Sequence, residues 1–112
     1  MRIIVISDTH QYYRNFETIV LRNPDADMFL HLGDGESEYQ LLCRNMPEVA
    51  DKFRYVKGNC DYSSDAPLTE LIDIAPNHRI LATHGHRYRV NSTLDYLEQE
   101  ALENGCDVAL YG

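Results

Sequence analysis

The chain has 112 residues, 44% of them hydrophobic and 25% charged, which suits one globular domain over residues 1–112. No apolar run approaches a signal-peptide core or a membrane span, so we expect a cytoplasmic protein without a membrane partner. The formal net charge of -8 disfavours a nucleic-acid partner but leaves open a small phosphorylated substrate held at bound cations. Three widely spaced cysteines without a CxxC pair argue against a disulfide framework or a zinc ribbon.

The first half of the chain alternates strands with helices. Residues 2–7, 28–32 and 53–56 form short apolar runs that predict buried strands. Apolar residues at helical spacing predict helices over 12–21 and 39–46, each with a proline shortly after its end. This alternation indicates an α/β fold with a mostly parallel sheet.

The second half of the chain predicts a β-hairpin, a helix and a final strand. These elements occupy residues 68–74 and 79–83, 92–102, and 108–110. The turn of the hairpin lies at 75–78. Ser92 is the expected N-cap of the helix, and Asn104-Gly105 is its expected C-terminal stop.

Each predicted strand runs into side chains of the types that bind metals. In α/β sheets, ligands bind beyond the carboxyl ends of the strands, so these side chains are expected at one rim. In chain order they are Asp8, His10, Asp34, Asn59, His84 and His86. Glycines precede Asp34 and Asn59 and permit sharp turns that aim the following side chain.

The chemistry of this donor set indicates divalent metal ions. Carboxylate oxygens, imidazole nitrogens and an amide oxygen suit Mn, Fe, Zn or similar ions rather than a thiolate zinc site. Asp8 and His10 are two residues apart, so both point to the same side of an extended strand end. In two-metal hydrolases the ions lie about 3.5–4 Å apart and clamp the attacking and leaving oxygens.

The ordered motifs DxH, GD, GN and HGH resemble the calcineurin-like metallophosphoesterase family over the whole chain. The chain is most similar to the small bacterial and archaeal phosphodiesterases of the YfcE-like group. The resemblance implies a four-layer α/β/β/α sandwich and a metal-dependent phosphodiesterase or phosphatase. It also implies two divalent ions, with manganese expected first and Fe, Zn, Ni or Mg as alternatives.

By position, the resemblance gives roles to five residues. Asp8 and His10 would bind the first metal, and Asp34 would bridge the two ions. Asn59 and His84 would bind the second metal and are the expected catalytic side chains, with Asn59 near the phosphate. A hydroxide bridging the ions would attack the phosphorus in line.

Two departures from the family pattern bear on activity. The family closes its site with a GHxH motif, whereas this chain reaches Gly112 at that point, so we expect each metal to lack one protein ligand and the C-terminal part of the fold to be missing. The catalytic protein phosphatases of the family carry a histidine after the GN asparagine, where Cys60 stands here. A thiol is a poor general acid at neutral pH, and no base is placed to make it a nucleophile.

Simpler structural interpretations stay open for single residues. Asp34 and Asn59 follow glycines and would also suit plain turns. His84 and His86 would also suit structural roles, and His86 is otherwise a candidate phosphate contact. His31 lies inside a strand and is expected in the core or behind the metal ligands.

Two functions from different classes compete. The first is a metal-dependent phosphoesterase. The alternative is a non-catalytic interaction scaffold, as the retromer subunit of this fold is, or an inactive fragment. The sequence beyond Gly112 discriminates between them, because a following His-x-His favours the enzyme. A phosphoacceptor domain fits less well, since no later lysine stands at a strand end.

The expected missing end also predicts an uncovered sheet face. In the four-layer family fold, strands that complete the second sheet follow the GHxH motif. An apolar patch of several hundred Å² in water would cost on the order of 10 kcal/mol. We therefore expect either a natural chain longer by roughly 50 residues or burial of this face in a homo-oligomer.

Overall fold

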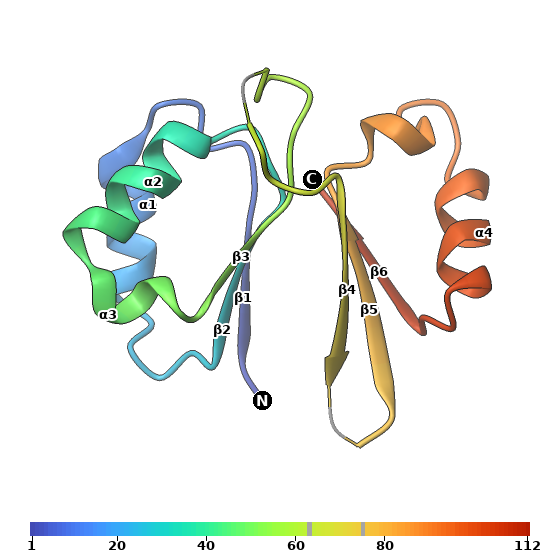
Figure 1. The fold of residues 1–112 in the computed structure, drawn as a ribbon, viewed down its shortest axis with the longest axis horizontal. Coiled ribbons are helices and arrows are strands. Elements are labelled where there is room, and N and C mark those ends of the chain that lie inside the picture. The colour runs from blue at the N-terminus through green and yellow to red at the C-terminus, as the bar shows by residue number, and fades with distance from the viewer. Residues whose placement is uncertain (63, 75) are drawn as a thin grey trace.

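The computed structural model describes residues 1–62, 64–74 and 76–112. Two three-stranded sheets stand face to face, and helices cover the outer side of each (Figure 1). The layers therefore follow the expected order α/β/β/α. The predicted hairpin turn includes Ala75, which lies outside the described residues.

The first sheet is parallel throughout, in the order β1-β2-β3. Its strands are β1 (Ile3–Ile6), β2 (Met28–His31) and β3 (Phe53–Tyr55), close to the predicted ranges. Parallel strands present their carboxyl ends at the same edge of a sheet. The loops that follow β1, β2 and β3 are therefore neighbours.

Three helices cover the outer face of this sheet: α1 (Tyr13–Leu21), α2 (Glu36–Asn45) and α3 (Pro47–Ala50). Phe16 of α1 and Leu42 of α2 are fully buried in the core cluster that they form with the sheet. Burying a side chain of this size contributes about 1.5–3 kcal/mol. This packing fixes where the loop between β2 and α2 lies.

Two boundaries in this region differ from the prediction. Helix α2 begins at Glu36, not at residue 39. Acidic residues favour the N-terminus of a helix, but they show no apolar periodicity, so the prediction missed the first turn. Pro47 was expected only to end a helix. It also starts the short α3 as a first-turn proline, a position that needs no N–H donor.

The second sheet has the order β4-β5-β6. Strands β4 (Thr69–Ile74) and β5 (His78–Thr83) form the predicted antiparallel hairpin, and β6 (Val108–Tyr111) pairs parallel to β5. The expectation of one mostly parallel sheet thus holds for the first sheet, whereas the second is mixed. Helix α4 (Asp95–Glu103) packs against it through a cluster that includes Leu97.

The prediction of Ser92 as the N-cap of α4 is wrong. The N–H groups of Ser92 and Thr93 both donate to the Arg89 carbonyl oxygen, which keeps Ser92 in the preceding turn. Asp95 begins the helix, and its N–H donates to Thr93 Oγ1 at 3.2 Å. The predicted stop at Asn104 is confirmed. A short 3₁₀ helix, η1 (His86–Tyr88), was not predicted.

The two sheets bury each other's inner faces. Leu30 and Val56 on the first sheet's side share one core cluster with Ile80 of the second. At the edge strands, however, Val5 and Val108 remain 46% and 40% exposed. Apolar surface therefore remains exposed at these two edge strands. A longer chain or a homo-oligomer stays a prediction.

None of the helices in the described ranges is long and apolar enough to cross a membrane.

Candidate metal centre

Three predicted ligands converge where the two sheets meet. Asp8 follows β1, Asp34 follows β2, and His84 follows β5. One ligand atom from each lies within 4.8 Å of the others. The end of β6 reaches the same place, because the Gly112 N–H donates to the His84 carbonyl oxygen at 3.1 Å.

Backbone strain is concentrated at this centre. Four of the five non-glycine residues with positive φ in the described chain lie here: Asp8 (57°), His10 (37°), Gln11 (70°) and Asp34 (62°). Such conformations cost free energy and cluster at functional sites. Two backbone hydrogen bonds hold the loops in register, from Asp8 N to Gly33 O at 2.9 Å and from His10 N to Asp34 O at 3.2 Å.

Asp34 is buried, with 5% exposure, and both of its carboxylate oxygens have close neighbours. Oδ1 accepts the Cys60 N–H at 2.7 Å, and Oδ2 lies 3.3 Å from His84 Nε2. The loop after β3 approaches so closely that a Cβ on Gly58 would lie 2.1 Å from Asp34 Oδ1. Only glycine fits there, so the glycine of the GN motif is required by the Asp34 carboxylate.

The orientation of His84 suits a metal ligand. Its Nδ1 lies 2.8 Å from the Leu32 carbonyl oxygen, which can only accept, so Nδ1 carries the proton. Nε2 is then the ring nitrogen that faces the Asp34 carboxylate. A cation between these two atoms would bind to both of them. A carbonyl oxygen behind Nδ1 is the usual support of a metal-binding histidine, and the donor set of Asp8, Asp34 and His84 fits a divalent ion.

The other two predicted ligands lie at the rim of the centre. His10 is half exposed, and its Nε2 is 3.4 Å from Asp8 Oδ1, outside the three-residue group. Asn59 is exposed and lies between Gly58 and Cys60, which both contact Asp34. Their assignment as ligands therefore stays a prediction.

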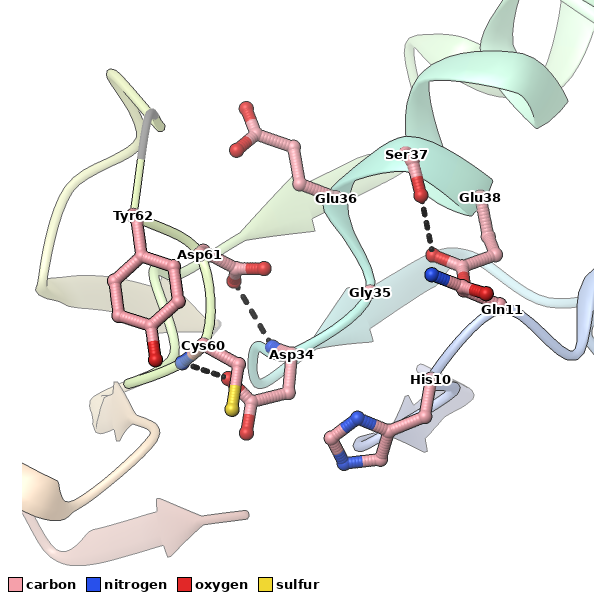
Figure 2. Close-up of a pocket in the computed structure, with 10 residues that line it drawn as sticks. All are labelled: His10, Gln11, Asp34, Gly35, Glu36, Ser37, Glu38, Cys60, Asp61 and Tyr62. Carbon is pink, nitrogen blue, oxygen red and sulfur yellow. Dashed lines mark hydrogen bonds between the residues drawn. The ribbon is translucent and has the colours of Figure 1, made fainter.

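A cavity of about 360 Å³ opens beside the centre, between the loops after β1, β2 and β3 and the first turn of α2 (Figure 2). Its lining residues are His10, Gln11, Asp34, Gly35, Glu36, Ser37, Glu38, Cys60, Asp61 and Tyr62. The cavity has room for a small ligand beside Asp34.

Comparison with known families agrees with this geometry. The model of the calcineurin-like phosphoesterase superfamily domain matches residues 1–112. The chain belongs to this superfamily. The resemblance inferred from the DxH, GD, GN and HGH motifs is thus confirmed.

Individual calcineurin-like phosphoesterases support the assignment. The chain is 34% identical to the probable metallophosphoesterase YsnB of Bacillus subtilis, over all of this chain and 63% of that protein. A predicted phosphoesterase from Streptococcus pneumoniae has a TM-score of 0.77 at 29% identity, over 98% of this chain and 60% of the other.

More distant structures share the fold alone. Vps29 of Chaetomium thermophilum has a TM-score of 0.75 at 23% identity, covering 98% of this chain and 60% of its own. The E. coli phosphoesterase YfcE has a TM-score of 0.59 at 20% identity, covering 78% and 59%. The chain spans about three fifths of the length of the proteins that it matches.

Asp61 is a residue of this phosphoesterase domain whose role sequence reasoning missed. Its Oδ2 accepts the N–H of Asp34 at 2.9 Å, the N–H of Gly58 at 2.8 Å and the Tyr55 hydroxyl at 2.7 Å. The Tyr55 oxygen in turn accepts the Gly35 N–H at 3.0 Å. Asp61 therefore joins the loops after β2 and β3. The sequence feature that could have indicated this role is the position of Asp61 in the turn that starts at Gly58, because aspartate often accepts backbone hydrogen bonds in turns.

The pKa values of this network are consistent with its geometry. Burial raises the pKa of Asp61, but the hydrogen bonds from Gly58, Tyr55 and Asp34 outweigh burial and lower it below the usual value. Burial and the hydrogen bond to Asp61 raise the pKa of Tyr55. The carboxylate is thus charged and the phenol neutral at physiological pH.

His31 supports the same loops from the core, as expected. Its Nδ1 accepts the Gly33 N–H at 3.1 Å, so Nε2 carries the proton and donates to Thr9 Oγ1 at 3.1 Å. Burial lowers the pKa of His31 to about 4. The ring is therefore neutral and links the DxH loop to the GD loop.

Proposed function

We propose that this chain forms the metal centre of a phosphoric ester hydrolase that cleaves phosphodiester or phosphomonoester bonds with two divalent ions. The observation that carries the proposal is the convergence of Asp8, the buried Asp34 and His84, whose ligand atoms lie within 4.8 Å of one another. This donor set suits a divalent cation. The superfamily assignment gives the reaction class.

Five side chains would hold the two ions. Asp34 would bridge them, Asp8 and His10 would hold the first, and Asn59 and His84 the second. When bound, such ions polarise phosphoryl oxygens and lower the pKa of water, which makes a nucleophile available at neutral pH. Manganese suits the mixed oxygen and nitrogen donors, as would Fe, Zn, Ni or Mg.

The rest of the chain would contribute preorganisation. The Leu32 carbonyl holds the His84 ring, and the Cys60 N–H holds one Asp34 oxygen. Asp61 anchors the Asp34 backbone. Holding reacting groups in one geometry supplies a large part of enzymatic rate enhancement, so these contacts are expected to matter for turnover.

Protonation of the leaving group is expected to be inefficient in this chain. Desolvation and the neighbouring carboxylates, Asp34 first among them, raise the pKa of the exposed Cys60 thiol. The thiol therefore stays protonated at neutral pH and is a poor proton donor. Esters with good leaving groups, such as nitrophenyl esters, are the expected best substrates.

A non-catalytic scaffold is the alternative function. The likeness to Vps29 concerns the fold, and the retained group of Asp8, Asp34 and His84 favours metal binding. Metal binding without hydrolysis would support the scaffold.

The test is hydrolysis of bis(p-nitrophenyl) phosphate with Mn²⁺ by the wild type, Asp34→Asn and Asp8→Asn. Loss of a residue that only supports a metal ligand lowers metal affinity or activity by roughly 10–100-fold. Each substitution removes a ligand itself, so activity and bound metal are expected to fall by at least this factor. Asp51→Asn, an exposed carboxylate after α3, is the matched control. Unchanged activity and metal content in Asp34→Asn would refute the assignment.

A further inference from the structure

Glu38 is a buried carboxylate that the metal centre does not use. It lies in the first turn of α2, is 4% exposed, and lines the same cavity as Asp34 (Figure 2). Its Oε2 accepts the Ser37 hydroxyl at 3.1 Å. Its Oε1 is shielded from solvent, and no donor from the described residues reaches it. A buried carboxylate oxygen without a partner opposes folding.

Helix capping does not account for this residue. Gly35 is the N-cap of α2, so Glu38 stands at the third helical position, where glutamate usually accepts the N-cap N–H. The Gly35 N–H donates instead to the Tyr55 hydroxyl at 3.0 Å. The helix dipole favours acidic residues in the first turn, but the more exposed Glu36 meets that preference without being buried.

The cavity carries a surplus of negative charge. Asp34, Glu36, Glu38 and Asp61 line it, and no lysine or arginine lines it within the described ranges. Asp61 is satisfied by three donors and Asp34 belongs to the metal centre. Glu38 remains as a buried carboxylate in the wall of the space into which a substrate would extend. A second anionic group on the substrate would be repelled there, and a cationic group attracted.

We propose that Glu38 forms a subsite for a primary ammonium group, so that the preferred substrates are phosphoesters of amino alcohols. An ammonium supplies both the donor that Oε1 lacks and the opposite charge that a buried carboxylate requires. A hydroxyl would supply the donor alone. The proposal rests on the proposed function for the phosphoryl end of the substrate.

An ammonium would reach Glu38 Oε1 only after a lining side chain moves, because Oε1 is shielded from solvent. Gln11 lines the same cavity (Figure 2) and is exposed, so its side chain is free to rotate. We expect a lining side chain such as Gln11 to move when the ligand binds.

The test uses two esters that differ only in an ammonium and a methyl group: p-nitrophenyl 2-aminoethyl phosphate and p-nitrophenyl propyl phosphate. With Mn²⁺, the wild type is expected to have a kcat/KM about tenfold higher for the aminoethyl ester, the size of one charge-assisted contact. Glu38→Gln is expected to lose this preference and keep its rate on the propyl ester. Glu48→Gln, an exposed carboxylate on α3, is expected to keep both.

Calorimetry with phosphoethanolamine and propyl phosphate separates this subsite from catalysis. Tighter binding of phosphoethanolamine than of propyl phosphate by the Mn²⁺-loaded wild type, lost in Glu38→Gln, would support the subsite. This holds even if neither ester is hydrolysed, because absent hydrolysis would contradict only the proposed hydrolase function. Equal binding of the two ligands by the wild type would overturn the ammonium subsite. A preference for phosphoethanolamine that survives in Glu38→Gln would overturn it as well. Urea unfolding is expected to show Glu38→Gln no less stable than wild type, because it removes an unpaired buried charge.

Discussion

His84 Nε2 lies 3.3 Å from Asp34 Oδ2, and the two residues come from different sheets. The Leu32 carbonyl oxygen accepts from the other ring nitrogen of His84, so Nε2 is the nitrogen available to a metal ion. Because Asp34 follows the first sheet and His84 the second, a bound ion would join the two sheets.

The first prediction follows from this junction. A ligand that binds only the folded state stabilises it by about 2.7 kcal/mol at a hundredfold excess over Kd. Mn²⁺ is therefore expected to raise the thermal midpoint by roughly 10–20 °C relative to EDTA, given the size of the chain. Asp34→Asn is expected to abolish the shift. An equal shift in this variant would place the stabilising ion elsewhere.

Gly58→Ala is expected to disrupt the centre by direct collision. The added Cβ would lie 2.1 Å from Asp34 Oδ1 and 2.4 Å from its backbone nitrogen. We expect a loss of Mn²⁺ affinity of at least about tenfold, measured by calorimetry. Gly105→Ala is the control. It strains a position with φ of 68° but meets no atom within 4 Å, so it should lower stability by about 1 kcal/mol and leave Mn²⁺ affinity unchanged.

Asp61→Ala is expected to lower both stability and metal affinity. It leaves the Asp34 N–H, the Gly58 N–H and the Tyr55 hydroxyl without their acceptor. Each buried unpaired donor costs about 1–3 kcal/mol, so the total is on the order of 3–9 kcal/mol in urea unfolding. Tyr55→Phe removes the bond to Asp61 and leaves the Gly35 N–H without its acceptor, but Asp61 keeps two of its three donors, so this variant should lose less stability than Asp61→Ala. Equal losses in the two variants would contradict the network.

Stability is expected to fall as the pH drops from about 6.5 to 4. Burial lowers the folded-state pKa of His31 to about 4, against an ordinary value of 6.5, with His84 acting in the same direction and Asp61 and Asp8 opposing. Within this window the unfolded chain binds a proton that the folded chain does not, so protonation favours unfolding. The full effect is on the order of 3 kcal/mol.

Urea unfolding in EDTA across this window checks the contribution of His31. His31→Gln removes the titrating ring, so its stability should depend much less on pH than that of the wild type. Parallel pH profiles for the two proteins would show that another group titrates.

Cys60→Ser is expected to keep metal-dependent hydrolysis within about threefold of wild type. The thiol is protonated at neutral pH because its pKa is raised, so it is neither nucleophile nor efficient acid. The contact to Asp34 is made by the backbone N–H of residue 60, which serine retains. Complete loss of turnover with metal content and folding intact would show a chemical role for the sulfur.

The sequence predicted the elements that rest on local patterns. The strands before Asp8, Asp34 and His84 are short apolar runs bounded by turn residues, and such runs are recognisable without tertiary information. Because parallel strands end at one edge, the convergence of Asp8 and Asp34 followed from the order of the elements. His84 follows a strand of the second sheet, so its place beside them depends on how the two sheets pack.

Features that depend on tertiary contacts were not predicted. The role of Asp61 depends on donors from another loop, and Ser92 was mistaken for a cap because the turn at Arg89 takes its N–H. The unpaired oxygen of Glu38 depends on Tyr55 taking the Gly35 N–H. Single-sequence patterns carry no signal for such competition between partners.

The most direct test of the metal centre is anomalous X-ray diffraction from crystals grown with Mn²⁺. The account predicts anomalous density within coordination distance of Asp34, with Asp8 and His84 among the ligands and a second peak about 3.5–4 Å away. A structure at saturating Mn²⁺ in which Asp34 and His84 contact each other without an ion, or in which the ion lies away from both, would contradict it.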